Sequence, residues 1–293
     1  MRNFKDNIMK NLIKRHPVLF FYLLVFAISW GGILILIGGP NNIPGPKEQA
    51  EKLFGLALVI MFAGPFISGI LMNFLVDGKE GLRMLRSHLL QLRVKGCWYV
   101  IAVLTGPLLV AAILFGLSIF NQEFLPGIVT AKDKLSLIIF NVAMGLIGGG
   151  LLEETGWTGF AVPRLRKRYS ILSTGLIVGI LWGIWHFMIA FWASNYLAGT
   201  DSWIKFVAGF LAFYLLALPA YRVLLVFVYE RTKSLPVIMI MHAFLSASTL
   251  IFQPSATGEI SFIWNLVLGI ILWIIVVSVI AINRRSSLRK SDI

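Results

Sequence analysis

Long apolar runs separated by short polar gaps dominate this chain of 293 residues. Each run is close to the roughly 20 residues that an α-helix needs to cross the hydrocarbon core of a bilayer. The pattern therefore predicts an all-α polytopic membrane protein with eight transmembrane helices. No gap is long enough for a soluble domain, so we expect a single membrane domain over residues 1–293. The eight runs lie at about 18–38, 53–76, 97–120, 135–157, 172–195, 206–228, 236–252 and 262–282.

The placement of positive charge predicts the orientation of these helices. The chain has 26 Lys and Arg against 13 Asp and Glu, a net charge of +13. Of the 26, 21 lie in the two tails, in alternate gaps or, in the case of Arg222, inside a span near its end at such a gap, and only 5 lie in the other gaps. Such a bias is typical of cytoplasmic segments, so we expect both termini in the cytoplasm. The basic excess then indicates contact with membrane lipids and no nucleic-acid partner. We expect an integral, multi-pass protein of the cell (plasma) membrane.

Two adjacent acids, Glu153 and Glu154, interrupt a stretch that is otherwise apolar from Leu135 to Val162. A carboxylate at membrane depth costs several kcal/mol, very roughly, unless it is paired, hydrated or protonated. The other 11 acids lie in the tails or polar gaps. The glutamate pair is therefore the first candidate for chemistry.

Two histidines, His186 and His242, occupy the fifth and seventh apolar runs. One buried histidine is often a packing residue, but ionisable groups inside a membrane usually mark function. Counting from the predicted cytoplasmic ends places His242 about 9 Å deep and His186 about 20 Å deep. Glu153 lies in the cytoplasmic half of its run, which agrees with the depth of His242. The depth of His186 agrees only if the fifth helix tilts or begins with an interfacial stretch. We therefore expect a shared site that opens towards the cytoplasm.

Helical spacing adds supporting residues. Trp182, Ser246 and Thr158 lie four positions from His186, His242 and Glu154, so each shares the face of its partner. The glycines at 148–150 are compatible with close helix packing or with close approach of a substrate. Arg222, inside the sixth run, either extends to the lipid headgroups or supplies a positive charge to the glutamate pair.

These residues, in this order, resemble the motifs of the CAAX-protease and bacteriocin-processing family of intramembrane proteases, also called the Abi family. Its motifs are Glu-Glu-x-x-x-Arg, Phe-x-x-x-His and His-x-x-x-Asn or Asp. They correspond here to Glu153 to Thr158, Trp182 to His186, and His242 to Ser246. The family core spans about 135–252. Thr158 replaces the motif arginine, and we expect Arg222 to supply the missing charge.

The resemblance to type II CAAX prenyl endopeptidases implies hydrolysis of a peptide bond in a membrane-embedded peptide or lipoprotein. Glu153, steered by His186, would take a proton from the attacking water. His242 and Ser246 would stabilise the oxyanion, and Glu154 would orient the site. Thr158, Trp182 and Arg222 would contact substrate or support these groups.

The same residues are also compatible with a metal-dependent reaction. Glu153, His186 and His242 with a water would form the shell of a catalytic Zn²⁺, and the family is commonly described as metalloproteases. A metal-free glutamate mechanism uses the same residues. The single cysteine, Cys97, excludes a multi-cysteine metal site. The oligomeric state stays unspecified.

Two other functions are compatible with this pattern. The changes at Thr158 and Ser246 are compatible with a catalytically inactive family member that acts as an immunity or binding protein. Buried Glu and His pairs also form proton relays, which is compatible with a proton-coupled transporter. A transporter is typically built from repeated halves, and no internal repeat is evident in the sequence.

Overall fold

The computed structural model describes residues 11–194, 203–255 and 258–291, and these contain helices without a strand. Arg2, Lys5 and Lys10 of the predicted cytoplasmic tail lie outside these ranges, as do the side chains of the C-terminal basic residues. The main helices are α2 (Pro17–Ile37), α3 (Lys47–Leu89), α4 (Gly96–Ser118), α6 (Lys134–Met144), α9 (Ile171–Trp185), α10 (Phe187–Trp192), α12 (Trp203–Phe210), α13 (Leu218–Thr232), α14 (Leu235–Ile251) and α15 (Glu259–Ser291).

Seven helical segments in the described residues are long and apolar enough to cross a membrane. The remaining predicted span, 236–252, corresponds to α14, an apolar helix of 17 residues. It is shorter than the roughly 20 residues of a full crossing. The prediction of an all-α polytopic membrane protein is therefore confirmed. The helix α14 is shorter than the seven other apolar segments. The protein is an integral, multi-pass membrane protein.

The fourth span is longer than its apolar run predicted. It continues from Lys134 to Leu165, whereas the sequence predicted an end near residue 157. The extension remains helical because residues 157–162 are buried in the core. This span includes two π-helical stretches, η3 (Gly145–Glu153) and η4 (Trp157–Ala161), on either side of the short α7 (Glu154–Gly156). Such stretches are frequent at functional sites.

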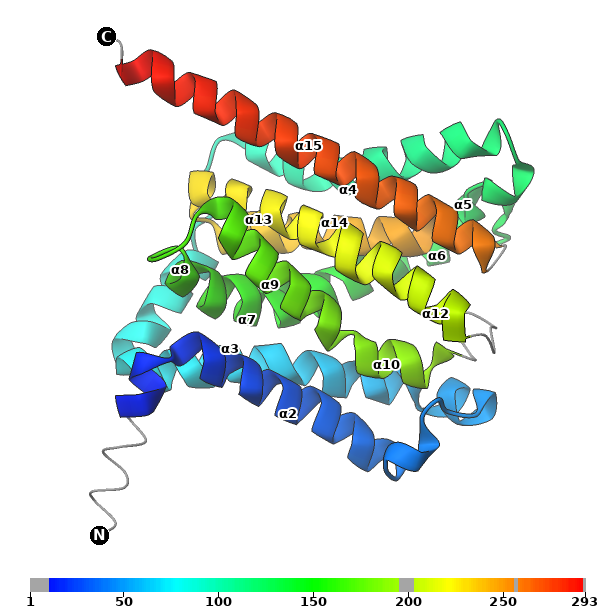
Figure 1. Ribbon diagram of the computed structural model, residues 1–293, viewed down its shortest axis with the longest axis horizontal. Coiled ribbons are helices and arrows are strands. Elements are labelled where there is room, and N and C mark those ends of the chain that lie inside the picture. The colour runs from blue at the N-terminus through cyan, green and yellow to red at the C-terminus, as the bar shows by residue number, and fades with distance from the viewer. Residues whose placement is uncertain (1–10, 195–202, 256–257, 292–293) are drawn as a thin grey trace.

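The helices lie alongside one another, and the first residues of α2 and the last of α15 reach the same side of the molecule (Figure 1). Basic segments 79–95, 164–168 and 231–233 meet at that side, which we call the basic end. Their contacts include Arg166 Nε to Glu230 Oε1 at 3.0 Å and Ser234 Oγ to the Gln91 carbonyl at 2.6 Å. The structure thus brings together segments that the charge pattern predicted to be cytoplasmic.

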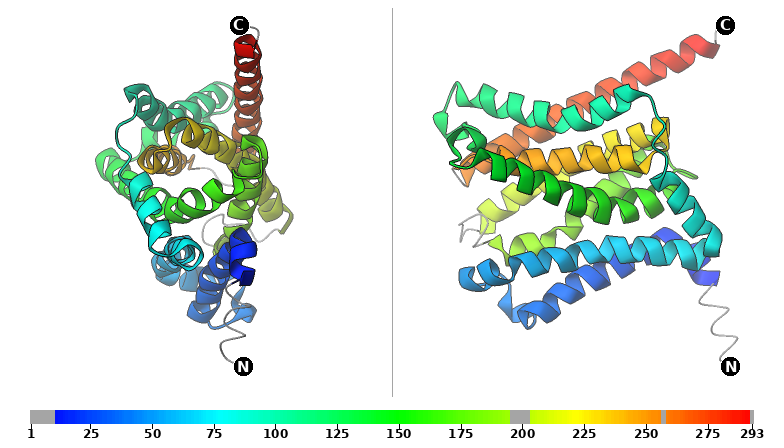
Figure 2. Two further views of the ribbon diagram at one scale, coloured as in Figure 1. Left: turned by 90° about the vertical axis from the view of Figure 1, so that its left-hand side faces the viewer. Right: turned by 180° about the vertical axis from the view of Figure 1, so that it is seen from behind.

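At the opposite side, which we call the far end, other loops join. The Gly45 amide donates to the Trp192 carbonyl at 2.8 Å, and the Gly127 amide to the Phe252 carbonyl at 3.3 Å. Seen along the helices, α2 and α3 lie on one side of the molecule and α15 on the other (Figure 2). The span that contains α13 is the most enclosed, with 67% of its apolar window buried.

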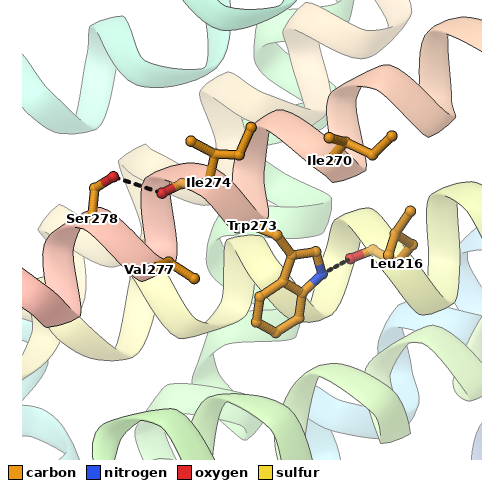
Figure 3. A pocket seen from close by; sticks show the side chains of 6 residues that line it. All are labelled: Leu216, Ile270, Trp273, Ile274, Val277 and Ser278. Atoms are coloured by element: carbon orange, nitrogen blue, oxygen red, sulfur yellow. Dashed lines mark hydrogen bonds between the residues drawn. The ribbon is translucent and has the colours of Figure 1, made fainter.

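Much of the outer surface is apolar. Ile35, Leu108, Phe140 and Val277, from four different spans, are all more than half exposed, as expected for side chains that face lipid. An open apolar groove of about 480 Å³ lies between α15 and η5 (Leu211–Ala217). There the Trp273 indole donates to the Leu216 carbonyl at 3.1 Å (Figure 3). The groove holds none of the predicted site residues.

Candidate active site

The two glutamates have separate environments, because successive residues of an α-helix point about 100° apart around its axis. Glu154 is fully buried and accepts bonds from three side chains on three elements. Its carboxylate lies 2.7 Å from Arg222 Nη1 and 2.6 Å from His242 Nδ1, and it also accepts a hydrogen bond from Thr158 Oγ1. Glu154 is therefore an enclosed anion, paired with a cation.

Arg222 lies where the missing motif arginine would be needed. Its side chain is fully buried, and its guanidinium carbon is 4.3 Å from the ring centroid of Trp182. Thr158, which replaces that arginine in the motif, contacts the same carboxylate. The structure thus places a positive charge from α13 beside Glu154, at the position that the sequence hypothesis required.

Glu153 faces a different set of groups. Its Oε2 accepts hydrogen bonds from the indoles of Trp157 at 3.0 Å and Trp182 at 2.6 Å. The side chain is only 3% exposed, yet it lines a cavity of about 230 Å³ together with His186 and Ser246. Glu153 is therefore oriented by two donors and lies beside a cavity in which a water and a substrate could meet it.

His186 sits at a break between two helices, since α9 ends at Trp185 and α10 begins at Phe187. Its Nδ1 lies 2.8 Å from the Trp182 carbonyl oxygen. A carbonyl can only accept, so Nδ1 carries the proton and Nε2 of the neutral ring keeps a lone pair. His186 can therefore accept a hydrogen bond from a water in the cavity.

His242 and Ser246 lie one turn apart on α14 and pack against Gly149. Because His242 Nδ1 donates to Glu154, its Nε2 can donate to a substrate only when the ring is protonated. Such an imidazolium and Arg222 would together balance the charges of both glutamates. Ser246 lines the cavity directly. Ser246 thus lines the cavity, and His242 lies one turn from it on the same helix.

The glycines before the glutamates allow this close packing. A Cβ on Gly149 would lie 2.8 Å from His242 Nε2 and 3.2 Å from Ser246 Oγ. We expect Gly149→Ala to lower activity by displacing these two groups, while the protein still folds. The control is Gly31→Ala, where a Cβ meets nothing within 4 Å. Activity and thermal unfolding in detergent should be measured for both; equal activity of the two variants would contradict this expectation.

The sequence pattern did not single out Ser29 and Trp30 of α2, yet both form hydrogen bonds with Trp185 at the helix break beside His186. The Trp185 indole donates to Ser29 Oγ at 2.8 Å, and Ser29 Oγ donates to the Met61 carbonyl at 2.8 Å. The Trp30 indole donates to the Trp185 carbonyl at 2.9 Å. Helix breaks leave carbonyls without a partner in their own helix, and here another helix supplies one. The only sequence signal was a serine and a tryptophan inside an apolar run.

Removal of the Ser29 hydroxyl should therefore destabilise the protein. Ser29→Ala leaves the buried Trp185 indole without an acceptor, at a cost of about 1–3 kcal/mol. Phe at position 185 has no indole N–H that needs an acceptor. Ser29→Ala should therefore lower the stability less in a Trp185→Phe protein than in the wild type. Thermal unfolding of the four proteins measures this coupling. Ser87→Ala, at an exposed serine, serves as the control; additive effects would contradict the expectation.

The possible metal ligands do not form a metal site in this geometry. Among the described residues, no three His, Cys, Asp or Glu side chains are grouped as a metal ion would require. The Glu153, His186 and His242 side chains considered above for Zn²⁺ are not such a group. We therefore derive no catalytic step through a metal.

The fold and the site together define a polytopic membrane protein that encloses a carboxylate–histidine centre. Residues 134–248 match the family model described as type II CAAX prenyl endopeptidase Rce1-like. The matched residues include all three motifs on which the predicted resemblance to the CAAX protease family rests. It is also similar to CAAX prenyl protease 2 of Methanococcus maripaludis, with 26% identity over 151 residues. That match covers 48% of this chain and 54% of the relative, so the chain spans about half the length of the curated relative.

Proposed function

We propose that this protein is an intramembrane endopeptidase that hydrolyses a peptide bond of a membrane-embedded or lipid-modified peptide. The observation that carries the proposal is that two adjacent glutamates have different surroundings. Glu154 is enclosed by Arg222, His242 and Thr158, whereas Glu153 lines the cavity. One carboxylate is thereby available to act on a water while its neighbour is neutralised.

The proposed reaction begins with a water held between Glu153 and His186. Glu153 accepts one of its protons, and His186 Nε2 accepts a hydrogen bond from the other. The water oxygen attacks the scissile carbonyl carbon, and the carbonyl oxygen becomes an oxyanion. Glu153 then transfers its proton to the departing nitrogen as the C–N bond breaks. Both products are peptides, one with a new carboxylate and one with a new amine.

Ser246 and His242 are the proposed stabilisers of the oxyanion. The Ser246 hydroxyl lines the cavity and can donate directly. His242 can donate through Nε2 when its ring carries both protons. Loss of one such donor typically lowers turnover about 10²–10³-fold. Ser246 in place of the motif Asn or Asp keeps the donor on a shorter side chain.

The test of this proposal does not need a known substrate. Membranes of cells that produce the wild-type protein should contain cleavage products that are missing when Glu153→Ala is produced at the same level. Mass spectrometry of membrane peptides detects the difference. Glu51→Gln, at an exposed glutamate that does not line the cavity, is the matched control and should give the wild-type pattern.

A catalytically inactive immunity or binding protein is the second candidate. It is favoured by the departures from the motif at Thr158 and Ser246. In that case Glu153→Ala would leave both the peptide pattern and any protective effect on the cell unchanged. Metal analysis of the purified protein, with chelator sensitivity of the cleavage, separates a metal-dependent from a metal-free reaction.

A further inference from the structure

We propose that Phe62 of α3 is a specificity-determining residue, whose ring limits the size of the apolar substrate side chain that fits beside Glu153. This inference rests on the proposed protease function and deepens it, because it names the kind of side chain next to the cleaved bond. Three features of the molecule point to this role. They are the place of the ring in the cavity wall, its contact with Gly148 and the fixed backbone that carries it.

One wall of the cavity is a face of α3. Four side chains of this helix line the cavity together with Glu153, and their spacing places them on one side of the helix. All four are apolar, so a polar substrate group against this wall would lose its hydrogen bonds to water. The substrate side chain that lies there must therefore be apolar as well. The four residues are Phe54, Leu58, Met61 and Phe62.

The ring of Phe62 lies on the backbone of Gly148, in the π-helical stretch η3 that ends at Glu153. A Cβ on Gly148 would lie 2.7 Å from Phe62 Cε2 and 2.7 Å from Phe62 Cζ. The far edge of the ring therefore fits there only because residue 148 has no side chain. Phe62 lines the cavity whereas Gly148 does not. The ring thus reaches from α3 to the helix of the glutamates and fills space that the cavity would otherwise have.

The backbone that carries Phe62 is held by a hydrogen bond from another helix. Pro65 lies inside α3, and because proline has no N–H, the Met61 carbonyl four residues earlier lacks its usual helical donor. Ser29 Oγ of α2 donates to this carbonyl at 2.8 Å and accepts from the Trp185 indole at 2.8 Å. The ring is therefore attached to a fixed point of α3 and rests on Gly148 at its other edge, so a larger substrate side chain meets a fixed wall.

The small size of the cavity makes the position of this wall important. Its 230 Å³ is below the roughly 300–1,000 Å³ of sites for drug-sized molecules. In an apolar pocket, one methylene more or less changes the discrimination between substrates about 10–200-fold. The ring of Phe62 is much larger than a methylene, so it decides which side chains fit. The substrates of the wild-type protein accordingly carry aliphatic rather than aromatic side chains next to the cleaved bond.

Two substitutions test the proposal in opposite directions. Phe62→Ala removes the ring, so peptides cleaved next to Phe, Tyr or Trp should increase at least about tenfold relative to peptides cleaved next to Ala or Val. Gly148→Ala adds a methyl group whose nearest neighbours are ring atoms of Phe62. The ring should move into the cavity, so cleavage next to Leu or Ile should decrease relative to cleavage next to Ala. Mass spectrometry compares the membrane peptides of cells that produce equal amounts of each protein.

The two changes together distinguish selection of the substrate from a role in packing. Without the ring, the methyl group at residue 148 no longer meets its three nearest atoms, so Gly148→Ala should hardly alter the peptide pattern of Phe62→Ala. Phe62→Leu should shift the ratio in the same direction by a smaller factor, and it replaces Phe62→Ala if thermal unfolding in detergent shows that the latter does not fold. The control is Phe74→Ala, at a residue of the same helix that is 49% exposed and does not line the cavity; it should give the wild-type pattern.

The outcomes separate this inference from the protease proposal. If a folded Phe62 variant keeps the wild-type ratio among the peptides whose formation requires Glu153, Phe62 does not select the substrate, while the protease proposal stands. An equally large effect of Gly148→Ala with and without the Phe62 ring would also overturn the role of the ring. If the wild-type protein forms no peptides that require Glu153, the protease proposal fails, and this inference fails with it.

Discussion

Glu153→Gln is expected to remove proteolysis while leaving the fold intact. Gln keeps the size of the side chain and an oxygen that can accept from the Trp157 and Trp182 indoles, which lie 3.0 and 2.6 Å from Glu153 Oε2. It cannot take a proton from water. General-base catalysis contributes typically about 10²–10⁴-fold. The rate of product formation in membranes should therefore fall by about this factor.

The stability of the Glu153→Gln variant should stay close to that of the wild type, because Glu153 lacks the ion pair that Glu154 makes with Arg222. The measurement is the rate of appearance of the Glu153-dependent peptides, combined with thermal unfolding in detergent. Wild-type cleavage by a folded Glu153→Gln protein would exclude the proposed role of this residue. Glu51→Gln provides the matched exchange outside the cavity.

Arg222→Met should cause the largest loss of stability among these changes. It would leave Glu154 as a buried carboxylate with hydrogen bonds from Thr158 and His242 but without its cation. Removing one partner of a buried ion pair typically costs about 3–5 kcal/mol. Thermal unfolding in detergent and the yield of folded protein measure the loss.

A second variant distinguishes the effect of the lost Arg222 charge from the effect of the changed side-chain volume. In the double variant Arg222→Met with Glu154→Gln, both charges are absent, so much of the stability should return. Arg83→Met breaks an exposed pair with Glu80, where the expected effect is only about 0–1 kcal/mol. If Arg222→Met leaves stability and activity unchanged, Arg222 does not act as the counter-charge of Glu154.

The hydrophobic pattern predicted the fold class because a bilayer imposes a simple rule on composition and length. An apolar run of about 20 residues has few alternatives to a membrane-spanning helix. Helix ends were less predictable. The apolar character of Trp157 to Val162 could not reveal that these residues continue the fourth span, since core packing decided it.

The candidate site was largely predictable because its residues are polar where polarity is costly. Glu153, Glu154, His186, His242 and Arg222 were selected by this criterion, and the structure brings them together around one cavity and one ion pair. Their partners were not predictable in the same way. Tryptophan and serine are common in apolar helices, so Ser29 and Trp185 carried no signal of their shared hydrogen bond.

By itself, the sequence determined the helical membrane fold, the family resemblance of its motifs and the set of ionisable residues, because each follows from local composition or spacing. The tertiary structure decided which glutamate is enclosed and which faces the cavity, since this depends on the rotation of one helix against α13 and α14. It also decided that Arg222 from a distant helix reaches Glu154 and that Glu153 shares its cavity with His186 and Ser246. Relations between helices are properties of packing in three dimensions, and no local pattern in the chain encodes them.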